Sequence, residues 1–406
     1  MKKRFTLGTV LALMLPVAVL AAIIAYSIVD QAFREKTESV SRQQQEFAKY
    51  SDARRKILDS FVGPADDSQL EDGAIRGMVA SLNDKYSHYL TAEEYEAYKG
   101  NMGSQSASIG VTACMSPEED ILVAEVYDGS PALEKGVERL DRIVAVDGRP
   151  VSEMGYQLAV SALSGEENTK VNITLLKASD GSQTELTLVR RNMDVRAVTS
   201  TILDGQNIGL VRIRDFQQSA VQDFRALVVQ LLNARVDALI FDVRNNPGGQ
   251  VDAMCSMLSM LLPKGEPLIT LRYKNGQEEP YASEGPGETD IPMVVLINEN
   301  SYSAAEFFAA VLQEYGKAVL VGEPTTGKGY AQKDIPLEDG SAVILSISEY
   351  FTPNGRSLSG VGLTPDYPVS LSPDAARHFG QVPHEQDSQL QKAIEVLTPL
   401  LPAEDN

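Results

Sequence analysis

Residues 298–332 read Asn298-Glu-Asn-Ser301-Tyr-Ser303-Ala-Ala-Glu306, then an apolar run, then Val319-Leu-Val-Gly322-Glu-Pro-Thr-Thr-Gly327-Lys328-Gly-Tyr-Ala-Gln332. The preceding run, Met293–Ile297, is short, apolar and β-branched, which predicts a buried strand. Apolar residues then recur at helical spacing, so we expect a helix to begin at or just after Ser303. Ser303 would therefore lie where a strand turns into a helix. Backbone N–H groups and the positive end of that helix could stabilise an oxyanion there.

A second apolar strand is predicted at residues 318–321, and Lys328 follows it between Gly327 and Gly329. Apolar neighbours desolvate a lysine and lower its pKa, and a neutral lysine can take the proton of a serine hydroxyl. None of the three histidines stands in a Ser-His-Asp context or at metal-ligand spacing. The pattern therefore indicates a Ser–Lys hydrolase that needs no metal.

The segment from Gly322 to Lys328 also matches most of a P-loop, which would bind a nucleotide. Gly329, however, stands where the Mg²⁺-binding serine or threonine should be. Residues 330–336 are strand-like, whereas a P-loop opens a helix. We therefore expect no nucleotide and no other cofactor.

The composition describes an acidic, soluble multidomain protein. The chain has 406 residues, which allow two or three domains, and a formal net charge of -20. That charge argues against binding to nucleic acid or to anionic lipid heads. The two cysteines, Cys114 and Cys255, are far apart in apolar settings, which favours buried free thiols over a disulfide.

The N-terminus has the pattern of a membrane anchor. Met1-Lys-Lys-Arg4 is basic, and residues 7–29 are apolar and uncharged, which is long enough to cross a bilayer. We expect an uncleaved anchor with its start in the cytoplasm and the chain after Asp30 outside, rather than a signal peptide cleaved near Ala22 or Ala25. Residues 31–49 would form a polar stalk.

Ser303, Lys328 and Gln332, together with their flanking residues, resemble the C-terminal processing peptidases, also called tail-specific proteases. That family often has serine where Ala305 stands. The resemblance implies a serine endopeptidase in which Ser303 is the nucleophile, Lys328 the base, and Gln332 orients the lysine by a hydrogen bond. It covers about residues 50–397.

A glycine-rich string, Asp242-Val-Arg244-Asn-Asn246-Pro-Gly248-Gly249, also matches this family closely. We expect Asp242 and Arg244 to tie the loop together. Gly248 allows the backbone to approach a substrate, so its N–H and that of Ala304 are the candidate oxyanion donors.

Residues 104–191 resemble a PDZ domain, which adds a C-terminal peptide to a sheet edge. The match to the carboxylate loop and its apolar pocket comprises Ser108, Ile109, Gly110, Val111, Leu158 and Ala162. Arg139-Leu140-Asp141 replaces the usual Pro-Gly-Asp. Ser164-Gly165 replaces Arg-Gly, so an arginine contact to the catalytic domain would be absent or supplied from elsewhere.

We therefore expect an α+β multidomain chain with a β-rich PDZ domain before an α/β core like that of crotonase and ClpP. The expected segments are an anchor (1–30), a stalk and helical segment (31–103), the PDZ domain (104–191), the peptidase domain (192–376) and a helical end (377–406). The expected function is that of an extracytoplasmic, membrane-anchored serine endopeptidase that recognises substrate C-termini. The alternative is a PDZ scaffold on a catalytically silent body. The resemblance also suggests a homodimer, because the family often dimerises through its terminal helices.

Overall fold

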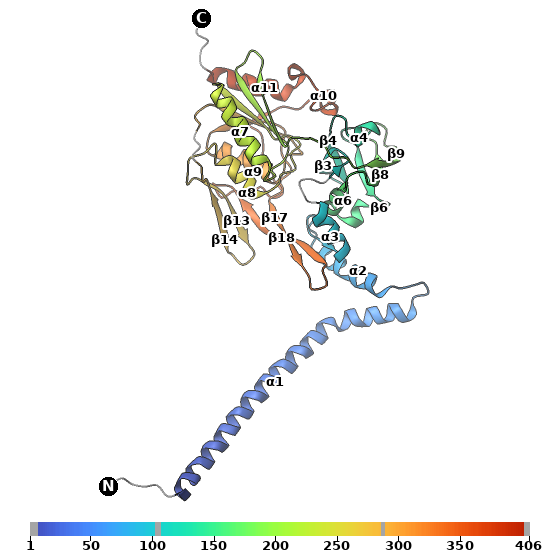
Figure 1. Cartoon of the computed structure of the whole chain (residues 1–406), viewed down its shortest axis with the longest axis vertical. Coiled ribbons are helices and arrows are strands. Elements are labelled where there is room, and N and C mark those ends of the chain that lie inside the picture. Colours follow the sequence, from blue (N-terminus) through green and yellow to red (C-terminus); the bar gives the residue numbers. More distant parts are fainter. Residues whose placement is uncertain (1–6, 102–106, 286–288, 402–406) are drawn as a thin grey trace, which may run out of the picture. The chain divides into compact units, whose positions relative to one another are not determined.

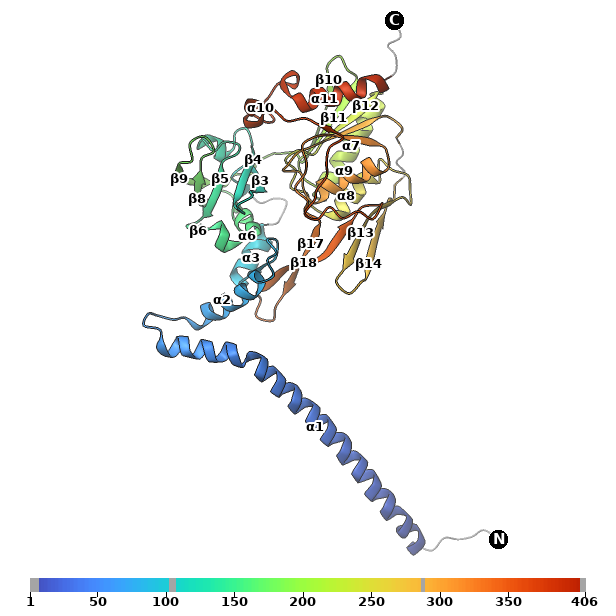
Figure 2. The same cartoon turned by 180° about the vertical axis from the view of Figure 1, so that it is seen from behind.

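The computed structural model describes residues 7–101, 107–285 and 289–401 (Figure 1; Figure 2 shows the reverse side). The chain forms two compact units, Met1–Gly77 and Met78–Asn406. The first unit contains helix α1 (Leu7–Ser60), which joins the predicted anchor and stalk in one helix, and the start of α2 (Asp67–Ala80). Within the part of the chain that the structure describes, no helix has both the length and the apolar character needed to span a membrane.

The PDZ-like segment is built on an antiparallel sheet with the strand order β3-β4-β5-β8-β9. Alternate residues of its strands, such as Val123 and Ile173, face a common apolar core, as period-two patterning requires. Strand β3 is an edge strand of this sheet. The elements are β2 (Ala107–Ser108), β3 (Val111–Met115), β4 (Ile121–Val126), α4 (Pro131–Glu134), β5 (Arg142–Val146), β6 (Arg149–Pro150), α5 (Val151–Met154), α6 (Tyr156–Ser161), β7 (Ser164–Gly165), β8 (Lys170–Leu176) and β9 (Gln183–Val189).

The loop that departs from the usual Pro-Gly-Asp supplies the arginine contact to the catalytic domain. Leu140 adopts a φ of 72°, a left-handed conformation that glycine takes more easily. The preceding Arg139 donates from Nε to the Ala124 carbonyl (2.9 Å), and its Nη2 lies 3.5 Å from Asn245 Oδ1 in the catalytic domain. Arg139 also contacts the carbonyl of Ala376.

The core of the segment after the PDZ-like domain is a six-stranded sheet with the order β10-β11-β12-β15-β16-β19, parallel except between β10 and β11. Strands β12 and β15 are buried along their whole length, which explains their apolar runs. Helices α7, α8 and α9 pack on one face and α11 on the other (Figure 1). The elements are β10 (Val198–Leu203), β11 (Ile208–Ile213), α7 (Ala220–Asn233), β12 (Ala238–Asp242), α8 (Val251–Leu258), β15 (Met293–Ile297), α9 (Ala304–Glu314), β16 (Ala318–Gly322), β19 (Tyr367–Pro368) and α11 (Ser388–Leu397).

A second, antiparallel sheet follows the order β1-β18-β13-β14, with β17 paired to β18. Lys328 lies in the loop that leads from β16 of the parallel sheet to β17 of this one. The predicted strand at residues 330–336 is confirmed as β17, which agrees with the rejection of a P-loop. The remaining elements are β1 (His88–Leu90), α3 (Ala92–Asn101), β13 (Pro267–Tyr273), β14 (Glu278–Ala282), β17 (Tyr330–Pro336), β18 (Ala342–Phe351), α10 (Pro373–Arg377), and the 3-10 turns His384–Gln386 and Thr398–Leu400.

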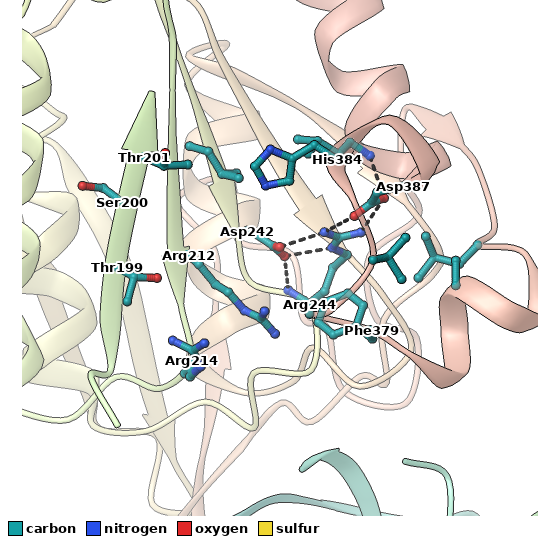
Figure 3. A pocket seen from close by; sticks show the side chains of 16 residues that line it. Thr199, Ser200, Thr201, Arg212, Arg214, Asp242, Arg244, Phe379, His384 and Asp387 are labelled. Atoms are coloured by element: carbon teal, nitrogen blue, oxygen red, sulfur yellow. Dashed lines mark hydrogen bonds and ion pairs between the residues drawn. The ribbon is translucent and has the colours of Figure 1, made fainter. Parts of the chain in front are cut away.

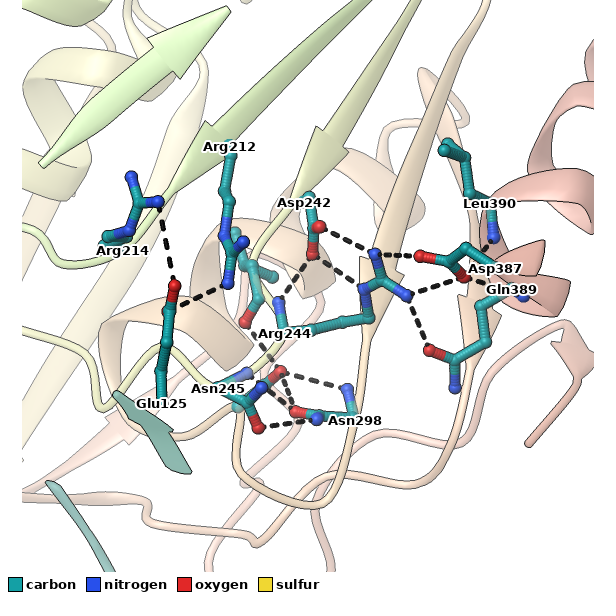
Figure 4. Close-up of polar contacts among 12 residues, drawn as sticks. Glu125, Arg212, Arg214, Asp242, Arg244, Asn245, Asn298, Asp387, Gln389 and Leu390 are labelled. Atoms are coloured by element: carbon teal, nitrogen blue, oxygen red, sulfur yellow. Dashed lines mark hydrogen bonds and ion pairs between the residues drawn. The ribbon is translucent and has the colours of Figure 1, made fainter. Parts of the chain in front are cut away.

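A buried ion-pair network fixes the carboxyl end of β12 to the start of α11 (Figure 4). Arg244 is 4% exposed and binds both oxygens of Asp242, at 2.9 and 2.8 Å. The same guanidinium donates to Asp387 (3.0 and 2.8 Å) and to Gln389 (2.9 Å). Asp387 in turn caps α11 by accepting the N–H groups of Gln389 and Leu390. These contacts agree with the structural role expected for Asp242 and Arg244.

Replacing Arg244 with methionine should strongly destabilise the Met78–Asn406 unit. Arg244→Met leaves the buried Asp242 carboxylate, and that of Asp387, without a counter-charge, which costs about 3–5 kcal/mol of unfolding free energy. Urea unfolding monitored by circular dichroism measures this loss. As the control, Arg272→Met removes an exposed ion pair with Glu278 and should cost about 1 kcal/mol or less. Equal losses in the two variants would contradict a network role for Arg244.

Candidate active site

Ser303 lies in a strained turn between β15 and α9. The predicted strand and helix are confirmed on either side of it. Its backbone angles are φ 58° and ψ −125°, a conformation that non-glycine residues rarely adopt. A sharp strand-to-helix turn of this kind presents a nucleophilic serine in other hydrolases. Ser303 is 9% exposed, so its surroundings are largely dry.

Lys328 has the environment that a general base requires. Burial lowers the pKa of Lys328 to about 8. The nearby carboxylates of Asp84 and Glu306 act in the opposite direction and raise it. The Lys85 ammonium lowers it further. The lysine Nζ lies 4.8 Å from the centroid of the Tyr86 ring. Because its pKa is near neutrality, an appreciable fraction of Lys328 is neutral and able to accept a proton.

The turn that carries Tyr86 was not recognised from the sequence as part of the site. Asp84 holds this turn by accepting the Tyr86 N–H (3.1 Å) and the Ser87 hydroxyl (2.5 Å). The Ser87 hydroxyl also accepts the N–H of Ser346 on β18 at 3.0 Å. The segment just before β1 therefore packs over the lysine. Its sequence carries no periodic signal that would place it there.

The carboxylate of Glu306 joins two loops, the serine loop (residues 298–303) and the lysine loop (residues 323–329). No role was predicted for Glu306 from the sequence. Glu306 is fully buried, and its Oε2 accepts the backbone N–H groups of Ser303 and Lys328, both at 2.9 Å. Its Oε1 accepts the hydroxyl of Thr325 (2.5 Å) and the N–H of Gly327 (2.8 Å). Burial raises the pKa of Glu306, whereas these hydrogen bonds lower it. The Ser-x-x-Glu spacing of a capping box was the available signal.

The shared oxygen sets how near the two candidate residues lie. Since both hydrogen bonds to Glu306 Oε2 are 2.9 Å long, the backbone nitrogens of Ser303 and Lys328 are separated by no more than twice that length. Within the described residues no hydrogen bond joins the serine hydroxyl to the lysine ammonium. Catalytic hydrogen bonds commonly tighten only when substrate binds, so this separation is compatible with proton transfer.

Gln332 does not make its predicted contact in this structure. Its amide donates to the Tyr330 carbonyl (3.0 Å) and the Ser346 hydroxyl (3.1 Å). A register shift between Ala331 and Gln332 accompanies this orientation. No hydrogen bond to Lys328 occurs among the described contacts. The orienting role of Gln332 therefore stays a prediction.

The two predicted oxyanion donors lie beside Ser303, but one of them is occupied. A Cβ added to Gly248 would lie 2.8 Å from Ser303 Cβ and 3.1 Å from Ala304 N, so only glycine fits this approach. Ala304 begins α9, and its N–H therefore has no acceptor within that helix. The Gly248 N–H donates to Asn246 Oδ1 at 2.8 Å. The Gly248 N–H would have to break this hydrogen bond to Asn246 before it could bind an oxyanion.

The glycine-rich loop and the serine loop are held together by amide side chains (Figure 4). Asn245 N donates to Asn298 Oδ1, and its own Oδ1 accepts from Asn298 Nδ2, both at 2.9 Å. The Ser301 hydroxyl donates to the Val243 carbonyl at 2.8 Å. These bonds fix the loop ends of β12 and β15 at one edge of the sheet, where open α/β sheets place their sites.

The PDZ residues predicted to bind peptide fall into two groups: some form the loop backbone, and others bury their side chains in the PDZ core. Gly110 has a φ of 81°, and its N–H donates to the Ser108 hydroxyl at 3.2 Å. Ile109 is fully buried and Leu158 is 5% exposed, so both side chains belong to the PDZ core. Val111 and Ala162 are partly buried and pack against that core.

A cavity of about 210 Å³ lies at Arg244 (Figure 3), and no residue of the serine loop lines it. Its arginines are paired: Arg212 lies 2.9 Å and Arg214 3.7 Å from the Glu125 carboxylate of the PDZ domain. The aromatic ring of Phe379 packs against the guanidiniums of Arg212 and Arg244, both 4.7 Å from its centroid. These pairings indicate that the cavity lies where the PDZ domain, the parallel sheet and the C-terminal segment contact one another.

Comparison with known proteins identifies the domains. A model of peptidase family S41 matches residues 207–369, a PDZ domain model matches residues 122–177, and a model of the N-terminal domain of the activating protease CtpB matches residues 20–94. The carboxy-terminal processing protease CtpA of Bacillus subtilis is 32% identical over 340 residues, which are 84% of this chain and 72% of the relative. A carboxyl-terminal-processing protease of Synechocystis is 31% identical over 329 residues, covering 80% and 76%. The solved structure of a photosystem II D1 C-terminal processing protease matches with a TM-score of 0.66 at 26% identity, covering 86% of this chain and 90% of that one.

Replacing Glu306 with glutamine should disrupt the site although the side chain keeps its shape. Three of the four partners of Glu306 are backbone N–H groups, which can only donate. In Glu306→Gln the amide NH₂ must therefore face at least one backbone N–H, which costs about 1–3 kcal/mol of unfolding free energy. We expect at least a hundredfold loss of peptidase activity, measured with an unfolded protein substrate.

The matched control is Glu314→Gln, at the other end of α9. Glu314 also accepts a backbone N–H, from Asn354 at 2.9 Å, and pairs with the half-exposed Arg356 at 3.5 Å, but it contacts neither Ser303 nor Lys328 in the described hydrogen bonds. Its replacement should leave activity within about twofold of wild type. Full activity in Glu306→Gln would refute the bridging role of this carboxylate.

Proposed function

The chain belongs to the carboxyl-terminal processing proteases of peptidase family S41, and we propose that Ser303 and Lys328 are its catalytic pair. The protein is thus a serine peptidase that acts on protein or peptide substrates. One observation supports this choice of residues above the others: Glu306 Oε2 binds the backbone of both, at 2.9 Å each. Burial lowers the pKa of Lys328 to about 8, and Ser303 lies in a strained turn.

The proposed reaction is acyl transfer in two steps. Neutral Lys328 takes the proton from the Ser303 hydroxyl, and Ser303 Oγ attacks the scissile carbonyl carbon. The N–H of Ala304 stabilises the oxyanion, and that of Gly248 joins it after leaving Asn246 Oδ1. The Lys328 ammonium then gives its proton to the departing amine. A water molecule, deprotonated by the same lysine, then attacks the acyl carbon, and the lysine returns this proton to Ser303 Oγ as the ester bond breaks.

We further propose that the PDZ domain binds the C-terminal end of substrates. Strand β3 is an edge strand, and the loop from Ser108 to Val111 precedes it directly. An extended peptide can therefore add to the sheet at β3, with its carboxylate in that loop. Gln332 is proposed to orient Lys328 once substrate displaces its bonds to Tyr330 and Ser346.

We also propose that the enzyme is anchored in the membrane with its catalytic part outside the cytoplasm. The apolar, uncharged run at residues 7–29 and the basic start support this. This run forms the first part of helix α1, which continues to Ser60.

The rate of cleavage should follow the deprotonation of Lys328. Because burial lowers the lysine pKa to about 8 and the neutral form is the base, kcat/KM should rise about tenfold per pH unit below pH 8 and level off above it. The assay is cleavage of an unfolded protein with an apolar C-terminus between pH 5 and 9. Ser303→Ala and Lys328→Ala should be inactive. A flat profile, or activity in Ser303→Ala, would refute the pair and favour a scaffold role.

A charge variant tests whether the acid limb, the rise of kcat/KM with pH below pH 8, reports the deprotonation of Lys328. Removing the Asp84 carboxylate takes away a charge that raises the lysine pKa, so Asp84→Asn should move the limb to lower pH. The asparagine retains an oxygen for the Tyr86 N–H. Glu338→Gln, an exposed change in the turn between β17 and β18, should leave the limb unmoved.

Deleting residues 1–30 should release the enzyme from membranes. Full-length protein should sediment with the membrane fraction and resist an alkaline wash, because a span of about 20 apolar residues holds it there. The deleted form should remain in the supernatant and keep its peptidase activity. Recovery of the full-length chain in the supernatant would contradict the anchor.

A further inference from the structure

We propose that Tyr302 is a positioning residue for Ser303, and that its hydroxyl occupies the place on β3 that a long substrate C-terminus must take. Binding of such a peptide would therefore move the residue next to the nucleophile. This inference rests on the proposed roles of Ser303 and of the PDZ groove.

Tyr302 belongs to the serine loop, yet its side chain lies in the PDZ domain. It is 6% exposed and packs with Cys114 and Ala124 of the PDZ sheet. Its hydroxyl accepts the backbone N–H of Met115 on β3 at 3.0 Å. The same hydroxyl lies 3.5 Å from that of Tyr156, the first residue of α6. Tyr302 therefore contacts both elements between which a PDZ ligand inserts, β3 and α6.

The Met115 N–H is a group that a substrate strand would use. The next residue, Ser116, donates its N–H to the Asp120 carbonyl in the turn toward β4, so Met115 directs its own to the open edge. Met115 stands four residues beyond Val111, where the carboxylate loop ends. In an antiparallel ladder a peptide held at that loop reaches Met115 only with about its fifth residue from the C-terminus. A longer peptide and the Tyr302 hydroxyl cannot both bind this N–H.

Displacing Tyr302 acts directly on the oxyanion donors. The Tyr302 N–H donates to the Asn246 carbonyl at 3.2 Å, and Asn246 Oδ1 holds the Gly248 N–H at 2.8 Å. A Cβ on Gly248 would also lie 2.8 Å from the Tyr302 carbonyl, so these loops are in close contact. When Tyr302 moves, the bond to Asn246 is released, and the Gly248 N–H can turn to the reacting carbonyl. Long peptides should therefore raise the reactivity of Ser303.

A hollow lies beside α6, one of the two elements that border the peptide groove. This hollow of about 650 Å³ is lined by Tyr156, Gln157 and Val160 of α6, and by residues at the start of α7. Tyr156 thus borders both the hollow and the Tyr302 hydroxyl. The hollow therefore offers space for a peptide beside α6.

Peptide binding provides the first test. Fluorescently labelled peptides of about three and about seven residues, ending in leucine and alanine, would be titrated into the full-length protein and followed by anisotropy. Tyr302→Phe keeps the ring but frees the Met115 N–H. It should bind the longer peptide about five- to tenfold more tightly and the shorter one unchanged. Equal affinity of the variant and the wild type for the longer peptide would overturn the proposal, and so would failure of every form to bind.

The matched control is Tyr127→Phe. The Tyr127 hydroxyl contacts the Thr112 hydroxyl on the same strand at 2.8 Å, but both residues belong to the PDZ domain. Loss of this hydroxyl should leave the affinity for both peptides as in wild type. A matching gain in Tyr127→Phe would show that any hydroxyl removal loosens β3, and would count against a special place for Tyr302.

The reactivity of Ser303 provides the second test. Labelling by a fluorophosphonate, which esterifies reactive serines, should accelerate several-fold when wild type is saturated with the longer peptide, but not with the shorter one. In Tyr302→Phe the rate should no longer depend on peptide. A peptide response that persists in the variant would refute the coupling. If Ser303 is never labelled in any form, the proposed function fails, while the binding comparison still decides whether Tyr302 occupies the groove.

Discussion

The proposed catalytic centre depends on the buried carboxylate of Glu306. Placing a charge in the interior is costly unless hydrogen bonds replace the lost water, and here four donors do so. Two of them belong to the backbone of Ser303 and Lys328. The cost of burying Glu306 is therefore offset only when the serine loop and the lysine loop are both in place. Stability of the fold and assembly of the active site are in this way the same event.

The protonation of Lys328 reflects a balance of opposed effects. Burial disfavours the ammonium, whereas the Asp84 and Glu306 carboxylates favour it, and burial prevails. The result is a pKa of about 8 rather than a lysine that is fully neutral or fully charged. Such a group can take a proton from serine and return it to the leaving amine, because neither form is far more stable than the other at neutral pH.

The parts of the fold that depend on local pattern were predictable from the sequence. The apolar run of β15, the helix after Ser303 and the strand after Lys328 follow from periodicity, and the structure confirms them. Contacts between distant segments were not predictable in this way. The placement of Tyr86 over Lys328 depends on the docking of a turn onto β18, and the sequence carries no periodic signal for it. Gln332 shows the same limit, since a register shift in β17 decides where its amide lies.

The two sides of the PDZ domain differ in the kind of contact that holds them. On one side its apolar core continues into Leu90 of β1 and Ile344 of β18, which is costly to separate in water. On the side of the serine loop the apolar contact is small, Tyr302 with Cys114 and Ala124. The other contacts are polar, the Tyr302 hydroxyl on Met115 and the Glu125 carboxylate near Arg212 (Figure 4). A peptide strand at β3 can replace the Tyr302 hydroxyl with a carbonyl acceptor of its own, so that the Met115 N–H stays paired. The apolar side can therefore act as a hinge while the polar side exchanges its internal partners for a peptide. In the proposed coupling, this asymmetry lets a ligand at β3 reach Ser303 while both apolar cores stay in place.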